Sequence, residues 1–223
     1  MWYVLKSQSA VMATFVSFLL MSPYAQTEPN HKIFVTSHVY TGNLGGIEGA
    51  STKCQARANA AGLLGTFKAL LWNGKGNAKK DLVFHAPIEN GYGAVIAKGK
   101  GELFSGRLTY PVQYNEYGAA ITENMSAWSG STGRGRKHSL NCRNWSSETT
   151  FDQGRIGTTD HSSSNWLSSG NVNCASLRRL YCVSQYTWLK TVHNAEIFEA
   201  IPTIIPLLAK GIDPNALITN PER

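Results

Sequence analysis

Short apolar runs separated by polar, turn-forming segments predict a domain of short strands with one clear helix. The apolar stretches Lys32–Thr36 and Phe67–Trp72 indicate a first strand and a buried strand, and Leu180–Val183 indicates a closing strand. Residues 81–117 contain short apolar pieces broken by Gly and Pro and give no clear assignment. No internal repeat and no heptad pattern is visible, so we expect one α+β domain.

The helix is expected at residues 51–61, after a glycine-rich turn at Gly42–Gly49. Ser51 or Thr52 is a suitable N-cap, and Gly62 is a natural stop. Helical spacing places Cys54, Ala58 and Ala61 on one face. We therefore expect Cys54 to be held from a helix.

The first 25 residues have the features of an export signal. Lys6 is the only charge before Glu28, and Ala10–Met21 is an unbroken run of apolar and small residues. The run is shorter than the ~20 residues that span a bilayer, and Ala25 is a plausible cleavage position. We predict a cleaved signal at 1–25, with an uncleaved N-terminal anchor as the alternative, and a secreted, periplasmic or cell-surface protein without a stable membrane span after cleavage.

A domain at residues 31–185 is expected to be followed by an extension at 186–223. Trp188–Ala200 predicts a helix, but Pro202 and Pro206 preclude a regular helix in the apolar stretch beyond it. The extension is too short to form a core of its own.

The chain has four cysteines, Cys54, Cys142, Cys174 and Cys182, and none of them forms a Cys-x-x-Cys pair. An even count in an exported chain predicts two disulfides, and spacing alone leaves all three connectivities open. The formal net charge is +7, which favours acidic glycans or anionic lipids as partners. Export makes nucleic acid the least expected anion, and we expect no nucleic-acid partner.

One block of sequence carries a family resemblance. Trp128-Ser-Gly-Ser is followed by Gly-Arg pairs and by Cys142-Arg-Asn-Trp145, and Gly154-Arg155, Cys174 and Leu180-Tyr-Cys182 follow in order. The block resembles the core of the endostatin domain of collagens, and it is similar to secreted bacterial domains of that superfamily. The resemblance covers about Lys32–Gln185.

The resemblance implies a C-type-lectin-like, endostatin-like α+β fold with two nested disulfides. It pairs Cys54 with Cys182 around an inner pair of Cys142 and Cys174. A lectin-type calcium site is not expected, because Trp72-Asn73-Gly74 lacks the following aspartate and the region beyond Trp128 has few acids. We expect neither a metal nor a cofactor.

Basic side chains crowd the second half of the domain and suit sulfate, phosphate or carboxylate groups, because guanidinium groups donate paired hydrogen bonds to them. Endostatin likewise binds heparan sulfate through surface arginines. The candidate anion-binding residues are Arg134, Arg136, Lys137, Arg143, Arg155, Arg178 and Arg179. Trp166 is the candidate for an exposed aromatic platform, although a core position is favoured for it, and Trp128 and Trp145 are expected in the core.

We therefore expect a non-catalytic binding or adhesion module that recognises an anionic glycan or a protein partner through a basic loop surface. One alternative is a cell-envelope hydrolase using His138 or His161 as a base. Asp160-His161 with a serine suggests a triad, but serines are abundant and Gly-x-Ser-x-Gly is absent. The other alternative is a structural envelope protein that assembles through residues 186–223. The sequence does not indicate an oligomeric state.

Overall fold

A computed structural model describes residues 29–73 and 78–185. The predicted signal and C-terminal extension lie outside these residues. Within the described ranges, no helix is long and apolar enough to cross a membrane.

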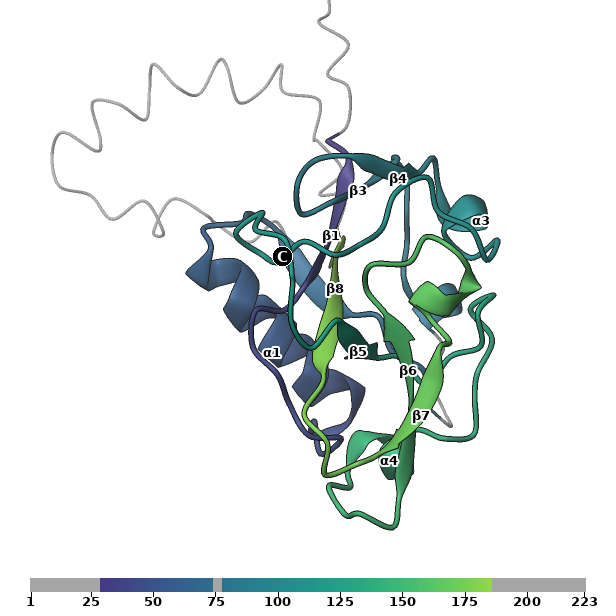
Figure 1. Ribbon diagram of the computed structural model, residues 1–223. Helices are drawn as coiled ribbons and strands as arrows, with labels where there is room; N and C mark the ends of the chain where they lie inside the picture. The colour runs from purple at the N-terminus through teal and green to yellow at the C-terminus, as the bar shows by residue number, and fades with distance from the viewer. Residues whose placement is uncertain (1–28, 74–77, 186–223) are drawn as a thin grey trace, which may run out of the picture.

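The described chain is a mixed α/β domain built on one sheet (Figure 1). Its strands are β1 (His31–Val35), β2 (Thr66–Ala69), β3 (Ile88–Asn90), β4 (Val95–Ala97), β5 (Ser126–Trp128), β6 (Gln153–Thr158), β7 (Gly170–Asn173) and β8 (Arg179–Gln185). Its helices are α1 (Gly46–Ala60), the short α2 (Ala78–Asp81), α3 (Lys100–Leu103) and α4 (Cys142–Trp145), and the 3-10 turn η1 (Ser164–Trp166). The strand order is β4-β3-β1-β8-β5-β6-β7, and β2 also pairs with β8.

The closing strand β8 is the centre of the sheet. It is buried along its whole length and pairs with β1 on one side and with β2 and β5 on the other. Because β1 and β8 are antiparallel neighbours, the start and the end of the domain lie side by side (Figure 1). The predicted first and closing strands are confirmed, each within a few residues.

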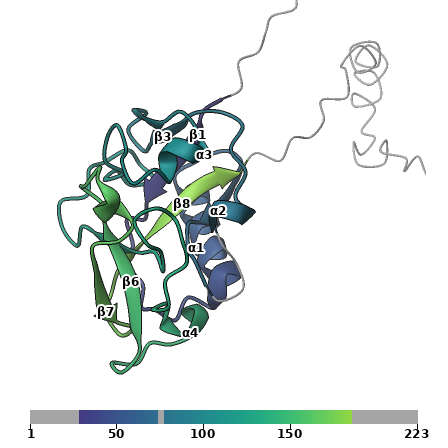
Figure 2. The same ribbon diagram turned by 90° about the vertical axis from the view of Figure 1, so that its right-hand side faces the viewer.

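The two faces of β8 serve two separate cores, because side chains alternate along a strand. Leu180 and Cys182 face α1, in a cluster with Trp128 and Trp145. Tyr181 and Val183 face the opposite side, in a cluster covered by loops rather than by a long helix. Figure 2 shows α1 lying along its face of the sheet.

Helix α1 is longer than predicted, because it begins at Gly46 inside the expected glycine-rich turn. The turn is confined to Gly45 and Gly46, whose φ angles are 79° and 74°. A Cβ on Gly49 would lie 2.2 Å from the carbonyl oxygen of Leu44, so a glycine is needed where the helix passes this loop. The predicted cap at Ser51 or Thr52 is wrong, because both residues lie inside the helix. Ser51 Oγ accepts instead from Ala69 N, at 3.2 Å.

Both disulfide pairs implied by the resemblance are present and nested. Cys54 on α1 is bonded to Cys182 on β8, and Cys142 is bonded to Cys174. Disulfides persist in oxidising compartments, which is consistent with export.

The inner disulfide holds an unusual backbone. Residues 142–145 all have positive φ, from 49° to 67°, and none is glycine. Left-handed residues normally occur singly, so tertiary contacts must maintain this turn. They include Trp145 Nε1 donating to Trp72 O at 2.9 Å. A local hydrogen bond also supports the turn, since Asn141 Oδ1 accepts from Asn144 N at 3.0 Å.

Residues 81–117 form β3, β4 and α3, which are too short for sequence periodicity to reveal. Phe67–Trp72 is confirmed as a buried segment, although the strand proper ends at Ala69. Trp72 then contacts a different part of the sheet, since its N–H donates to Ser129 O at 3.0 Å.

We predict that removing the outer disulfide costs more stability than removing the inner one. The loops close over 128 and 32 residues, and the chain-entropy model gives about 5 and about 3.7 kcal/mol respectively. The measurement is urea unfolding of Cys54→Ala/Cys182→Ala and Cys142→Ala/Cys174→Ala. If the inner-pair variant is the less stable of the two, the loss of stability is determined by the left-handed turn and not by loop entropy.

His31 makes stability depend on pH. Its buried ring has Nδ1 3.0 Å from Ser184 O and accepts from His85 N through Nε2, at 3.1 Å. A carbonyl only accepts and a backbone N–H only donates, so the ring is neutral with its proton on Nδ1. Burial is the main cause that lowers the pKa of His31 below its usual 6.5.

Because the unfolded chain takes up this proton more readily, the free energy of unfolding should decrease as pH falls below about 6.5. Stability is full above that value and is lost as pH drops through the folded-state pKa. Denaturant titrations at several pH values between neutral and acid give the free energy of unfolding at each pH. This free energy should decrease less with falling pH in His31→Asn than in the wild type. An equal decrease would contradict the assignment.

Candidate functional site

The loop from Ser131 to Lys137 is a tight hairpin. Its ends pair as a β-bridge, and Thr132 N donates to Arg136 O at 2.8 Å. Thr132 Oγ1 accepts from Arg136 N at 3.1 Å, and Gly135 N donates to Thr132 O at 3.0 Å. The hairpin backbone is therefore internally fixed.

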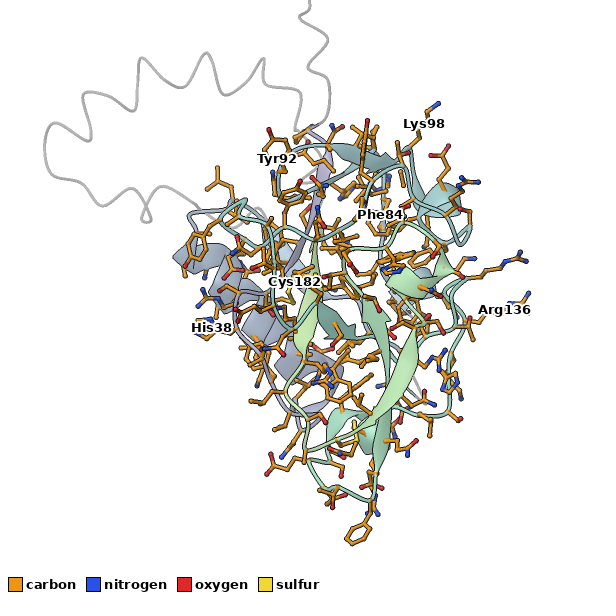
Figure 3. All side chains as sticks on the ribbon, in the orientation of Figure 1. His38, Phe84, Tyr92, Lys98, Arg136 and Cys182 are labelled. Carbon is orange, nitrogen blue, oxygen red and sulfur yellow. A yellow bond between two sulfur atoms is a disulfide. The ribbon has the colours of Figure 1, made fainter. Side chains whose placement is uncertain are left out.

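Gly135 anchors the hairpin to the core. Its φ is 69°, and a Cβ there would lie 2.6 Å from the Phe104 ring, so only glycine fits. Trp72 Nε1 donates to Gly135 O at 3.1 Å. The side chains of the neighbouring residues are consequently directed outward, and Figure 3 shows Arg136 projecting away from the body of the molecule.

Beside this hairpin lies an open hollow of about 450 Å³. Its lining residues are two arginines, a glycine and three hydroxyl-bearing residues: Thr132, Gly133, Arg134, Arg136, Ser164 and Ser168. Close packing between the hairpin and η1 forms its floor, since a Cβ on Gly133 would lie 2.5 Å from Ser164 Cβ.

A third guanidinium group is fixed at the edge of the hollow. Arg155, on β6, donates through Nε to Ser168 Oγ at 2.9 Å and through Nη1 to Asn171 Oδ1 at 2.9 Å. Both partners are neutral, so its charge is not compensated. We call the set formed by the hollow and Arg155 the basic hollow.

The basic hollow has no carboxylate among its lining residues. Within the part of the chain that the structure describes, Arg134, Arg136 and Lys137 are exposed and form no side-chain hydrogen bond or ion pair. Free guanidinium groups beside hydroxyl donors suit a sulfate or phosphate group.

His138 lies close enough to Arg155 to be affected by its positive charge. Its pKa is lowered from 6.5, first by burial and then by the charge of Arg155. Its Nδ1 accepts from Leu140 N at 3.2 Å, so the neutral ring already has a structural hydrogen bond.

Three of the seven predicted basic residues do not belong to this surface. Arg179 is only 9% exposed and donates to the carbonyl oxygens of Thr36, Ser37, Glu123 and Asn124. Its assignment to ligand binding is wrong, because a buried strand position converts the guanidinium into a structural clamp.

Arg143 and Arg178 are also separate from the hollow. Arg143 is ion-paired with Asp152, with Nε 2.9 Å from Oδ2, so its charge is compensated. Arg178 lies next to Tyr40 through paired backbone hydrogen bonds, and its Nη1 donates to Leu177 O. The hollow thus contains Arg134 and Arg136, with Arg155 at its edge and Lys137 in the same hairpin.

Trp166 is 0% exposed, so the favoured core position is confirmed and the exposed platform is wrong. Its ring packs at 5.5 Å against Tyr181, and its carbonyl accepts from Tyr181 Oη. The polar serines around it cover η1 while the indole points into the core. Trp128 and Trp145 are buried beside the inner disulfide, as predicted.

The candidate catalytic groups form no relay. Asp160 Oδ1 lies 2.9 Å from His161 Nδ1, and no hydroxyl among the described residues is hydrogen-bonded to that ring. Ser37 Oγ lies 3.2 Å from His38 but donates to Glu116, at 2.5 Å, and so is committed to a buried carboxylate. Within residues 29–73 and 78–185, no group of three or more His, Cys, Asp or Glu could hold a metal ion.

A second hollow of about 450 Å³ lies between the start of α1, β2 and α2. Its floor is apolar, with Ala69, Leu71 and Leu82, and its rim carries both signs of charge in Glu48 and Lys68. It lacks the uncompensated positive charge of the basic hollow.

Sequence reasoning missed Ser164, Ser168 and Asn171. A serine-rich loop after an arginine-bearing strand was the available signal, but only strand pairing shows which hydroxyl groups reach Arg155. No model of a known protein family matches the chain, and no curated protein matches it.

We predict that Arg179→Ala lowers the free energy of unfolding by about 3 kcal/mol, because it leaves buried carbonyl groups without a charged donor. Arg136→Ala should change it by less than about 0.5 kcal/mol, as expected for an exposed side chain. Urea denaturation of both variants is the measurement, and equal effects would contradict the division into structural and free arginines.

Proposed function

We propose that this protein is an exported, non-catalytic binding module that recognises a sulfated glycan through the basic hollow. The observation that carries the proposal is the gathering of Arg134, Arg136 and Arg155 beside serine hydroxyl groups with no compensating carboxylate. Sulfate accepts several hydrogen bonds at once, and the hollow offers both fork-shaped and hydroxyl donors.

We further propose that the fold is C-type-lectin-like and endostatin-like. Support comes from the two nested disulfides, from the burial of Trp128 and Trp145 beside the inner one, and from the pairing of the first strand of the described domain with its last. These features agree with the sequence block that resembles endostatin.

The rigidity of the hollow favours binding without a chemical step. The hairpin is fixed by its own hydrogen bonds and by Phe104, and Arg155 is held by Ser168 and Asn171. Preorganised donors lower the entropic cost of binding. Nucleophile and base are not paired within the hollow, so recognition alone accounts for its residues.

We predict that Arg134→Ala/Arg136→Ala weakens binding to heparin about tenfold, since exposed charge contacts contribute up to about 1 kcal/mol each. The measurement is salt elution from a heparin column together with titration against a heparin oligosaccharide. The matched control is Lys68→Ala/Lys98→Ala, which removes the same charge from exposed positions outside the hollow.

If both double variants lose the same affinity for heparin, only net charge matters, and the basic hollow is not the binding site. A second readout is the His138 ring followed by NMR. A bound sulfate should raise the pKa of His138, because a nearby anion offsets the charge of Arg155. An unchanged His138 titration at saturating ligand would place the anion elsewhere.

A further inference from the structure

Two five-residue turns on the surface have the same sequence pattern. Asn90–Ala94 reads Asn-Gly-Tyr-Gly-Ala, and Asn115–Ala119 reads Asn-Glu-Tyr-Gly-Ala. No internal repeat was expected from the sequence, because a match of five residues is too short to recognise without the structure.

The two turns also share four hydrogen bonds. In both, the Asn N–H donates to the Ala carbonyl at 2.9 Å, and the Gly N–H donates to the Asn carbonyl, at 2.9 Å in the first turn and 3.0 Å in the second. The Asn Oδ1 accepts from the Tyr and Ala N–H groups, at 3.1 and 3.1 Å in the first turn and 2.9 and 3.0 Å in the second. The φ angles of Gly93 and Gly118 are 99° and 79°, a region open mainly to glycine.

The turns pack directly against each other. A Cβ on Gly91 would lie 2.5 Å from Asn115 O, and one on Gly118 would lie 3.3 Å from Gly91 O. Asn90 Nδ2 also donates to Pro111 O, at 3.0 Å, on the segment that leads into the second turn. The repeated motif is therefore one rigid surface.

Each turn displays its tyrosine to solvent, with Tyr92 73% and Tyr117 57% exposed. The Tyr92 ring stacks on Tyr114, with centroids 5.2 Å apart. Tyr117 is supported by Arg57, whose Cζ lies 5.8 Å from the ring centroid and whose Nη2 donates to Tyr117 Oη at 3.1 Å. Both rings are thus held in place, and both remain accessible.

The charged groups beside the turns are internally compensated. Glu116 is buried and paired with Arg57, and Glu89 is paired with Lys32 at 2.9 Å. Tyr92 lies at the top of the view in Figure 3, well apart from Arg136. This aromatic surface is electrostatically unlike the basic hollow.

We propose that Tyr92 and Tyr117 bind a linear, uncharged oligosaccharide. Sugar C–H groups carry partial positive charge and are attracted to the negative face of an aromatic ring, while tyrosine hydroxyl groups bond to sugar hydroxyl groups. The repeat argues for this ligand over a folded protein, because two turns of the same pattern present a tyrosine twice and a polysaccharide offers the same unit twice. Compensated charges argue against an ionic ligand.

The test is titration of the full, oxidised chain with the linear hexasaccharides of β-1,4-glucose, β-1,4-N-acetylglucosamine and α-1,4-glucose, by calorimetry and NMR. At least one should bind, and Tyr92→Ala and Tyr117→Ala should each weaken it about tenfold, since aromatic contacts contribute up to ~1.5 kcal/mol. Tyr92→Phe should retain most of the affinity. Phe151→Ala is the matched control, because Phe151 is 94% exposed but belongs to neither turn.

Binding should be insensitive to salt up to roughly 1 M and to Arg134→Ala/Arg136→Ala, which separates this site from the basic hollow. Absence of binding by all three hexasaccharides at millimolar concentration would overturn the proposal. So would binding that persists in Tyr92→Ala/Tyr117→Ala, or that Phe151→Ala weakens equally. Thermal unfolding of each variant checks that the fold is unchanged.

Discussion

The covalent bond between Cys54 and Cys182 is the constraint on which the rest of the structure depends. It joins the longest helix to a strand that is buried along its whole length and hydrogen-bonded on both sides. A small domain with short strands has little regular structure to hold it together, so a fixed central strand has an outsized effect. In the sheet, β8 pairs with β5 and β5 pairs with β6, the strand that carries Arg155.

Position relative to that strand divides the arginines into two kinds. Arg179 lies on β8 itself, where burial and four carbonyl groups make it a structural residue. Arg134 and Arg136 lie on a hairpin that is anchored through Gly135 and therefore face solvent. The same side chain stabilises the fold in one place and is free for a ligand in the other, because carbonyl groups shielded from water need a protein donor, whereas an exposed guanidinium group is hydrated.

The two proposed surfaces differ in their physical basis. The basic hollow relies on uncompensated charge and should respond to salt, whereas the paired tyrosine turns rely on fixed aromatic rings whose neighbouring charges are already matched. Both are built on tight turns, where glycine allows backbones to approach closely.

The sequence by itself determined the apolar stretches that form β1 and β8, the helical face that carries Cys54, and the family-like block that implied both disulfides. These features are local, or are encoded in residue order and spacing. Tertiary structure alone decided that Trp166 is buried, that Arg179 is a clamp, that Ser168 reaches Arg155, and that two short turns form one surface. Each of these depends on contacts between segments far apart in the chain, which neither residue type nor periodicity specifies.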